Sequence, residues 1–374
     1  MSPIYLDYNA TTPLLPEVVD AMLPFLRESF GNPSSDHPYG WTAREAVDKA
    51  RAEVAALLGC APEEIAFTSG GTEANNLAIR GIAPARPGAR RIVTSVVEHP
   101  AIAEPCAELE RTGWSVARLP VDAQGRVSVD DLVAALVPGT ALVTIMHANN
   151  ETGTVQPIAE IAAAAKDRGA LVHTDAAQSV GKLPVDVGAL GVDLLSIAGH
   201  KLYAPKGVGA LYVRRGTALG PFLRGAGQEK GLRPGTENVA GIAGLGAAAA
   251  AAKRDLDAIA TRLSSLTARL WDALARGVPG LALNGHPVER LPNTLNVRFP
   301  GVRGGALLAV VPEIAASTGS ACHAGSEKAS AAITAMGVPS DAALGSVRLS
   351  LGRGTTEEAV DIAAAALIRA FRSQ

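Results

Sequence analysis

The stretch Ser196-Ile197-Ala198-Gly199-His200-Lys201 decides the fold class, together with His173-Thr174-Asp175-Ala176-Ala177-Gln178 shortly before it. Each stretch belongs to an apolar β-type run that ends abruptly in polar residues. Open α/β sheets bind their ligands at the carboxyl ends of the strands. We therefore expect the carboxylate of Asp175 and the amine of Lys201 to lie at one edge of a mainly parallel sheet.

An acid and a lysine at such an edge indicate a particular cofactor. Asp175 can pair with a pyridine nitrogen and Lys201 can form a Schiff base. Proteins that bind pyridoxal 5'-phosphate provide both of these contacts. For either residue alone, a helix-capping aspartate or a surface lysine is an equally good interpretation. The pair, together with the polar strand ends described below, favours the cofactor.

The composition is that of a globular protein with a substantial core. The 374 residues are 48% hydrophobic and 19% charged, with a formal net charge of −2, so neither disorder nor nucleic-acid binding is indicated. The start lacks the pattern of a signal peptide. The longest small-apolar run, Val239–Ala252, is too short for a membrane span. We expect a soluble, cytoplasmic protein that binds neither nucleic acid nor membrane.

Strand-type and helix-type runs alternate through the first two thirds of the chain, which predicts a mainly parallel sheet with helices on both faces. After a long helical region the pattern becomes that of a smaller α+β unit. We place the boundary near Asp255, with a large cofactor-binding domain at residues 16–255 and a small domain at residues 1–15 and 256–374. The strands expected in the large domain are Ile65–Phe67, Ile92–Val97, Leu142–Met146, Ala170–Val172, Leu194–Ile197 and Val208–Val213.

Three further strand-type runs also end in polar clusters. Gly71 and Thr72 open a helix, whose free amides and dipole can hold a phosphate. His99 can stack on a flat ring or exchange protons, and Asn149 can donate to a cofactor or a substrate. Each alone has an ordinary interpretation as a helix start, a strand-end histidine or a turn. Their convergence on one sheet edge predicts a functional site there.

The three cysteines, Cys60, Cys106 and Cys322, show no Cys-x-x-Cys spacing. This argues against disulfides and against a thiolate metal cluster, and we predict no metal site. Cys60 and Cys106 lie in apolar surroundings and are interpreted as packing residues. Cys322 lies among small, polar and flexible residues, where its thiol would be accessible.

Nearly end to end, the chain resembles the cysteine desulfurases of the NifS/IscS group, which are fold-type I, class V aminotransferase-like enzymes. The resemblance implies a large domain with a mainly parallel seven-stranded sheet between helices, a smaller α+β domain that carries the catalytic cysteine loop, and a homodimer. Besides the clusters above, it rests on Tyr5–Pro13, Phe30–Ser35, Gly199–Lys201, Arg233–Asn238, the segment around Cys322 and Val347–Arg353.

The resemblance also implies a role for each residue of the predicted site. Lys201 would hold the cofactor, Asp175 would pair with its ring nitrogen, Gln178 would contact its ring hydroxyl, and His99 would stack on its ring. Thr236 would reach the phosphate held by the partner subunit. The implied residues are Gly71, Thr72, His99, Asn149, Asp175, Gln178, Ser196, His200, Lys201 and Thr236 for the cofactor, Asn149 and Arg348 for the substrate carboxylate, and Lys201, Cys322 and His99 for catalysis.

The implied reaction converts L-cysteine to L-alanine. Lys201 would remove the Cα proton, and Cys322 as a thiolate would attack the substrate sulfur. The sulfur would stay on Cys322 as a persulfide until an acceptor protein takes it. The sequence leaves that acceptor open between iron–sulfur assembly, tRNA thiolation and a biosynthetic pathway.

The pattern departs from this group around the implied nucleophile. His323 stands where desulfurases more often carry threonine, and Glu327–Ser330 lacks their Leu-Glu-Pro-Ser sequence. Cys-His at this place resembles selenocysteine lyases, so that activity is an alternative, as is a C–S lyase that releases free sulfide. A catalytically silent binding subunit is disfavoured, because Lys201, Cys322 and Arg348 are all present.

Overall fold

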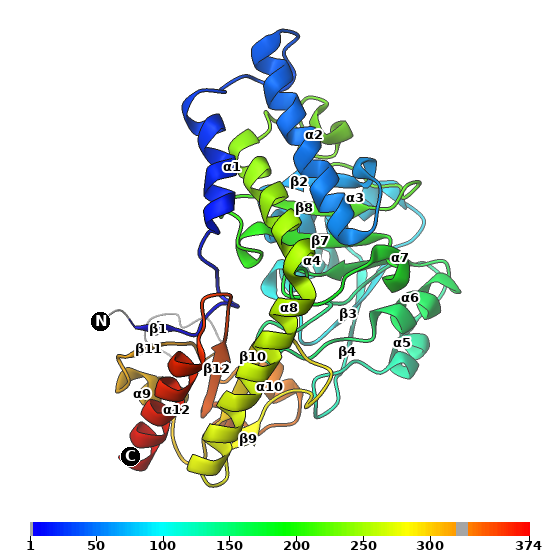
Figure 1. The fold of residues 1–374 in the computed structure, drawn as a ribbon. Coiled ribbons are helices and arrows are strands. Elements are labelled where there is room, and N and C mark those ends of the chain that lie inside the picture. Colours follow the sequence, from blue (N-terminus) through cyan, green and yellow to red (C-terminus); the bar gives the residue numbers. More distant parts are fainter. Residues whose placement is uncertain (1–2, 319–327) are drawn as a thin grey trace.

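The computed structural model describes residues 3–318 and 328–374, and it is built around one sheet of seven strands (Figure 1). The strands are β2 (Ile65–Thr68), β3 (Arg91–Ser95), β4 (Ser115–Leu119), β5 (Thr140–Thr144), β6 (Leu171–Asp175), β7 (Leu194–Ala198) and β8 (Gly209–Val213). They lie in the order β2-β8-β7-β6-β5-β3-β4. β8 pairs antiparallel with both of its neighbours, β2 and β7, and the other pairs of neighbours among these described strands are parallel. The predicted mainly parallel seven-stranded sheet is confirmed.

Helices cover both faces of this sheet. They are α1 (Pro16–Arg27), α2 (Pro38–Leu58), α3 (Gly71–Ala85), α4 (Pro100–Arg111), α5 (Val129–Ala135), α6 (Ile158–Lys166), α7 (Val187–Leu190) and α8 (Val239–Gly277). The core under α3 and α4 includes Leu77 and Ile102. The core on the opposite face includes Val54, Ile161 and Ile242, from α2, α6 and α8. Strands buried on both sides favour apolar residues, which explains why β5 and β7 are mostly apolar.

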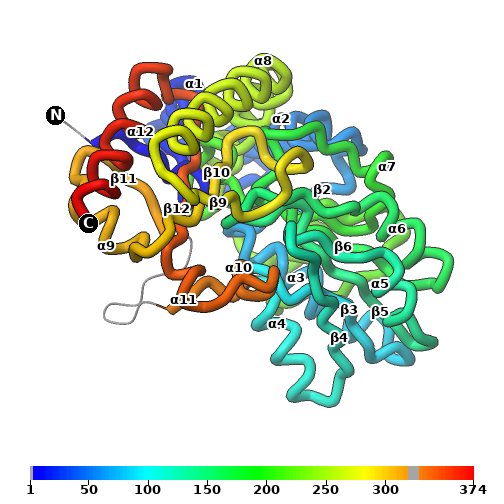
Figure 2. Tube along the Cα trace, turned by 90° about the horizontal axis from the view of Figure 1, so that it is seen from below, coloured from blue at the N-terminus to red at the C-terminus, as the bar shows by residue number. Residues whose placement is uncertain are grey.

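A smaller unit combines the two ends of the chain. Its elements are β1 (Ile4–Tyr5), β9 (Ala282–Leu283), β10 (Thr294–Arg298), β11 (Ile314–Ala315), β12 (Ser346–Ser350), α9 (Gly304–Ala309), α10 (Ala331–Ala335), α11 (Ser340–Ala343) and α12 (Glu357–Arg372). β10 pairs antiparallel with β9 and β12, and β1 pairs parallel with β11. Leu6 packs in the same core as Leu349 and Leu367. Figure 2 shows these elements gathered beside the large sheet.

The helix α8 joins the two units. Its first half places Leu245 in the core of the large sheet, and its second half places Leu266 and Leu270 in the core of the smaller unit. Asp255, where the sequence predicts the domain boundary, lies between these two sets within the helix. Neither α8 nor any other helix in the described ranges is long and apolar enough to cross a membrane.

The carboxyl ends of β3, β5, β6 and β7 meet at one edge of the sheet, because these strands are parallel. The smaller unit lies against that edge. Asp7 forms a bridge with Ser350 of β12, and the backbone N–H of Asn9 donates to the Ser350 hydroxyl at 3.0 Å. The N-terminal segment that follows β1 therefore lies between the sheet edge and β12, and the polar strand ends face it.

Candidate active site

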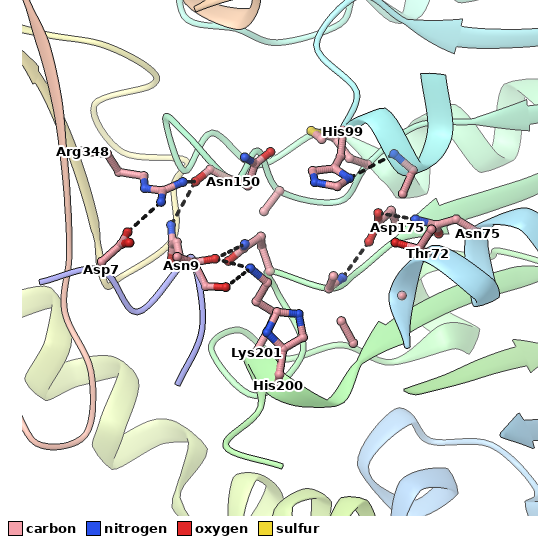
Figure 3. A pocket seen from close by; sticks show the side chains of 18 of the residues that line it. Asp7, Asn9, Thr72, Asn75, His99, Asn150, Asp175, His200, Lys201 and Arg348 are labelled. Carbon is pink, nitrogen blue, oxygen red and sulfur yellow. Dashed lines mark hydrogen bonds and ion pairs between the residues drawn. The ribbon is translucent and has the colours of Figure 1, made fainter. Parts of the chain in front are cut away.

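A cavity of about 430 Å³ lies at this sheet edge (Figure 3). Residues from both units form its wall, which combines carboxylates, amides, imidazoles, a lysine and an arginine. The lining residues are Asp7, Asn9, Ala10, Gly71, Thr72, Asn75, His99, Ala101, Met146, Ala148, Asn150, Asp175, Ala177, Gln178, Ala198, His200, Lys201, Ser317 and Arg348. The structure thus brings together most of the residues that the sequence predicts for the site.

Lys201 follows β7 in a short 3-10 turn, Gly199–Lys201, and its amine points into the cavity (Figure 3). The amine donates to the carbonyl of Ala10 at 2.7 Å and to the carbonyl of Asn9. Burial lowers the pKa of Lys201 to about 8, with a further lowering by the Arg348 charge and opposing effects of Asp7 and Asp175. A lysine with this pKa supplies neutral amine, the nucleophilic and basic form, near neutral pH.

Asp175 ends β6 and is held at both carboxylate oxygens. Its Oδ1 accepts from the backbone N–H of Ala177 at 2.9 Å, and its Oδ2 accepts from the side-chain amide of Asn75 at 2.7 Å. Only 8% of Asp175 is exposed. Two donors fix the carboxylate in one orientation. The second amide atom of Asn75, Oδ1, is buried and has no partner among the described residues.

His99 caps the start of α4 and borders the cavity. Its Nδ1 accepts from the backbone N–H of Ala101 at 3.1 Å. That contact assigns the proton of the neutral ring to Nε2, because an accepting ring nitrogen carries no hydrogen. Burial lowers the pKa of His99, and the nearby Lys201 charge lowers it as well, against the opposing charge of Asp175. The neutral imidazole with a defined tautomer suits a stacking residue beside a ring.

The start of α3 provides an anion site on the same wall. Gly70 precedes the helix with φ of 149°, a backbone conformation that side chains disfavour. A Cβ at Gly71 would come within 3.1 Å of the Cβ of Ala198, so glycine allows the helix start to sit close to the end of β7. Thr72 adds a hydroxyl beside the free first amides of the helix, which suits a phosphate.

Arg348 reaches the cavity from β12 in the smaller unit. Its Nη2 donates to Asp7 Oδ1 at 2.7 Å, and its Nη1 donates to the carbonyl of Asn150 at 3.0 Å. Arg348 is 5% exposed, and its buried Nε has no partner among the described residues. A guanidinium with a free donor on a cavity wall suits a carboxylate, which takes two parallel hydrogen bonds.

Comparison with known proteins assigns this arrangement to a family. The aminotransferase class-V family model matches residues 4–362. A cysteine desulfurase of Trichormus azollae is 49% identical over 363 residues, which cover 96% of this chain and 91% of that protein. Cysteine desulfurase IscS of Methanosarcina thermophila is 48% identical over 361 residues, 96% of this chain and 89% of that protein. The chain belongs to the cysteine desulfurases of the class-V aminotransferase family.

Solved structures agree with this membership of the desulfurase family. A NifS-like protein matches with a TM-score of 0.93 at 37% identity, over 100% of both chains. SspA in complex with cysteine matches with a TM-score of 0.83 at 38% identity, over 93% of this chain and 98% of that chain. The predicted fold type, the class of enzyme and the dependence on pyridoxal phosphate are confirmed.

The cavity residues fit the family's cofactor. The amine of Lys201 and the doubly held carboxylate of Asp175 face the same space, as a pyridine aldehyde requires. The helix start at Thr72 supplies donors for a phosphate. The unpartnered Oδ1 of Asn75 is a buried acceptor on the cavity wall that a bound group can satisfy. The described residues contain no cluster of His, Cys, Asp or Glu suited to a metal ion.

Two predicted desulfurase site residues lie away from the cavity. Ser196 is fully buried within β7, and its hydroxyl pairs with Nε2 of His173 at 2.9 Å. Asn149 is 3% exposed, and its Oδ1 accepts from the backbone N–H groups of Glu151 and Thr152, both at 2.9 Å. Both side chains form hydrogen bonds inside the protein, and the contacts predicted for them with the cofactor and the substrate stay predictions. Their neighbours Ala198 and Asn150 line the cavity in their place.

The remaining predicted residues divide into three groups. Gln178 and His200 lie on the cavity wall; Nδ1 of His200 pairs with the Thr11 hydroxyl at 3.2 Å, and burial lowers the His200 pKa to about 4. Thr236 is exposed outside the cavity, just before α8. Cys322, the predicted nucleophile, and the adjacent His323 fall outside the described residues.

Sequence reasoning missed five polar residues of the wall, which are Asp7, Asn9, Asn75, Asn150 and Ser317. Asp7 and Asn9 fall in the N-terminal segment that carries the family resemblance, and Asn75 lies in the helix opened by Thr72. Their place in these motifs was the feature of the sequence that could have identified them. Their contacts depend on pairings between residues far apart in the sequence, such as that of Asn75 with Asp175, 100 residues later.

Proposed function

We propose that this cysteine desulfurase converts L-cysteine to L-alanine and keeps the sulfur on Cys322 as a persulfide for an acceptor protein. The observation that carries the proposal is the meeting of three groups at one cavity: the amine of Lys201, the carboxylate of Asp175 and the guanidinium of Arg348. Asp175 comes from β6, Lys201 from the turn that follows β7, and Arg348 from β12 of the smaller unit. Reaction of an amino acid on pyridoxal phosphate requires these three groups: a basic amine, an acid that holds the cofactor ring, and a cation that binds the substrate carboxylate.

Arg348 would bind the substrate carboxylate through its free Nε and a neighbouring Nη. That contact fixes the amino acid relative to the cavity wall, so that its Cα lies within reach of the amine of Lys201. The carbonyls of Asn9 and Ala10 hold the resting amine. Orientation of this kind supplies a large part of enzymatic rate acceleration, because the reacting groups no longer have to find each other.

Lys201 would take the Cα proton of the bound substrate. Its pKa of about 8 leaves part of the amine neutral at physiological pH, as a general base requires. Pyridoxal phosphate, when bound, supplies an electron sink for the carbon from which the proton leaves. Asp175 would keep the ring nitrogen charged, and Asn75 and Ala177 keep Asp175 in place for that contact.

The sulfur transfer requires a nucleophile from the segment that contains Cys322. Ser317 lines the cavity shortly before that segment in the sequence. Attack by the Cys322 thiolate forms an S–S bond and breaks the substrate Cβ–S bond, whose electron pair stays with the carbon. Protonation of that carbon gives the methyl group of alanine, and the transferred sulfur stays on Cys322.

The decisive experiment is mass spectrometry of the cofactor-loaded protein after brief exposure to L-cysteine without reductant. One added sulfur on the Cys322 peptide is expected, with one alanine released per subunit. Cys322→Ala should abolish sulfur capture and keep the cofactor absorbance. Cys60→Ala is the matched control, because burial raises the Cys60 pKa to about 12 and keeps that thiol protonated. Full turnover in Cys322→Ala would refute the persulfide mechanism.

The same assay separates the two alternative reactions. Alanine with free sulfide and an unmodified Cys322 would identify a C–S lyase. Turnover of selenocysteine with negligible turnover of cysteine would identify a selenocysteine lyase. The relatives described above carry the desulfurase name, which favours cysteine as the substrate.

We propose that the enzyme is a homodimer. The end of α1 and the start of α2 expose Leu26, Phe30, Tyr39 and Trp41 by 63%, 79%, 60% and 52%, and large exposed apolar patches commonly mark interfaces. The exposed Thr236 fits a role toward a second subunit. Sedimentation velocity should give a dimer that Phe30→Ser with Trp41→Ser weakens. A wild-type monomer at micromolar concentration would contradict this proposal.

We also propose a cytoplasmic enzyme that passes its sulfur to an acceptor protein. Cys60 and Cys106 are free thiols, as is usual in reducing compartments. Iron–sulfur assembly is one candidate destination. Persulfide labelled with ³⁵S should move from Cys322 to an iron–sulfur scaffold protein, and persistent label on Cys322 would exclude that acceptor. Fractionation of cells should recover the enzyme in the soluble fraction.

A further inference from the structure

Lys182 is a buried lysine that the proposed mechanism does not use. It follows β6 by a few residues and is 7% exposed. Burial, with the charges of Lys201 and Arg348, lowers the pKa of Lys182 to about 7. No carboxylate pairs with Lys182 among the described residues. Its amine instead donates to two side-chain amide oxygens, Gln178 Oε1 at 2.9 Å and Asn9 Oδ1 at 3.2 Å.

Both acceptors of Lys182 line the cofactor cavity. A side-chain amide has a donor end and an acceptor end, and its surroundings decide which end faces a ligand. The amine of Lys182 binds the oxygen of Gln178, so Nε2 of Gln178 takes the opposite position. There Nε2 donates to the carbonyl of Asn9 at 3.0 Å. One hydrogen of Nε2 is left without an acceptor among the described residues.

The carbonyl of Asn9 joins Gln178 to Lys201. It accepts from Nε2 of Gln178 and from the amine of Lys201. Lys182 holds the side chain of the same asparagine, whose Oδ1 also accepts from Asn293 at 3.1 Å. Lys182 therefore stabilises both the orientation of Gln178 and the segment against which Lys201 rests. Charged or neutral, the amine has at least the two N–H groups that these acceptors need.

We propose that Lys182 is a positioning residue that makes Gln178 a hydrogen-bond donor toward the cofactor ring hydroxyl. The inference rests on pyridoxal phosphate as the cofactor and on the Gln178 contact implied by the family resemblance. An oriented N–H next to that oxygen favours its ionised form. A rotated amide would present Oε1 instead, and two oxygens facing each other would disfavour the ionised form and weaken binding.

Lys182→Met tests this inference, because methionine has similar length and no donor. Apo-protein is titrated with pyridoxal phosphate, without cysteine, and the dissociation constant and the visible absorbance maximum are recorded. We expect at least tenfold weaker binding, the usual order for a lost hydrogen bond with a charged partner, and a shifted maximum. Lys166→Met, which removes an exposed lysine of α6, should change neither value.

The background variant Gln178→Ala separates positioning from general stabilisation. With Gln178 removed, Lys182→Met should weaken cofactor binding by less than twofold, because no amide is left to orient. An equal loss in both backgrounds, or an unshifted absorbance maximum in Lys182→Met, would overturn the proposal. Lys182→Gln retains a donor and should bind the cofactor within threefold of the parent. If Lys182→Met does not fold, Lys182→Gln is the test variant. A tenfold loss of cofactor affinity in Lys182→Gln would refute the proposal.

This test is independent of the desulfurase reaction. Cofactor titration needs no substrate and no Cys322, so a failed persulfide experiment would leave its outcome unchanged. Equally, a Lys182 without influence on Gln178 would leave the sulfur transfer to Cys322 in place. The thermal midpoint of the apo variants completes the comparison. A positioning role predicts a shifted absorbance maximum, whereas a purely structural role predicts a lower thermal midpoint without that shift.

Discussion

Nη2 of Arg348 donates to Asp7 Oδ1 at 2.7 Å, so the predicted substrate-binding arginine is paired with a carboxylate before any substrate arrives. Side-chain exposures of 6% for Arg348 and 21% for Asp7 place the pair largely out of water. It joins the N-terminal segment to β12. A carboxylate that enters the cavity therefore meets a guanidinium that is already oriented and partly neutralised.

Asp7→Asn should strengthen substrate binding and weaken the fold. Without the competing carboxylate, Arg348 is freer to bind L-cysteine, and we expect the KM to fall about threefold. Loss of one partner of a mostly buried pair should also lower the free energy of unfolding by about 2 kcal/mol. Steady-state kinetics and urea denaturation measure the two effects. Asp20→Asn, at an exposed site in α1, is the control, and a higher KM in Asp7→Asn would contradict the competition.

Lys201 should capture pyridoxal phosphate with a pH midpoint near 8. Burial is the main cause of its lowered pKa, and the neutral amine that attacks an aldehyde accumulates as pH rises through that value. The midpoint is measured from the initial rate at which Lys201 binds the cofactor between pH 6 and 10, with the bound cofactor trapped by borohydride. Arg348→Met should move it upward, because the Arg348 charge helps to lower the pKa of Lys201. A midpoint near 10.4, the value of a free lysine, would refute the assignment.

The sheet was largely predictable because its central strands are buried on both faces. β5 and β7 are buried at every position, and their sequences are apolar except for Thr140, Thr144 and Ser196. The strand β4 was not predicted. It lies at the sheet edge, and its Ser115 and Arg118 are exposed. Partial exposure interrupts the apolar run that revealed the other strands.

Strand ends were predicted more reliably than the depth of each residue along a strand. Ser196 and Ala198 point to the same face of β7, because side chains alternate with a period of two. Ser196 lies two residues further from the strand end than Ala198, and there its hydroxyl forms a hydrogen bond with His173 of the neighbouring strand. Asn149 and Asn150 are equally polar in sequence. Only the turn that Asn149 closes shows that Asn150 is the residue at the cavity.

Glu229→Gln should destabilise the protein strongly. Glu229 accepts from both terminal nitrogens of Arg51 at 2.7 Å and from the backbone N–H of Phe67 at 2.8 Å, with its side chain 2% exposed. An uncharged replacement leaves the Arg51 charge unpaired, which costs about 3 kcal/mol or more. Urea denaturation measures the loss.

A surface pair serves as the matched control for Glu229. Glu313 contacts Arg369 at 3.5 Å, and their side chains are 45% and 68% exposed. Glu313→Gln should change the free energy of unfolding by less than about 0.5 kcal/mol. Equal losses in the two variants would mean that burial of the Arg51 pair does not determine its contribution.

Two buried histidines should make the fold sensitive to acid. Burial lowers the pKa of His173 to about 3 and that of His147 to about 4. The unfolded chain has the ordinary value of about 6.5, so below that pH it binds protons that the folded chain does not. Stability linked to these groups is therefore complete above pH 6.5 and is lost as the pH falls toward 4 and then 3.

His173→Gln should remove one of these proton linkages. The variant loses the paired contacts of His173 with Thr144 at 2.8 Å and Ser196 at 2.9 Å, so it should be less stable than the parent at pH 7 by about 1 to 2 kcal/mol. Between pH 6.5 and pH 5 the parent should lose about 2 kcal/mol through His173 alone, at 1.36 kcal/mol per pH unit. The two stability curves should therefore converge near pH 5. Parallel curves from pH 7 to pH 5, measured by urea denaturation at each pH, would show that His173 is protonated in the folded protein as readily as in the unfolded chain.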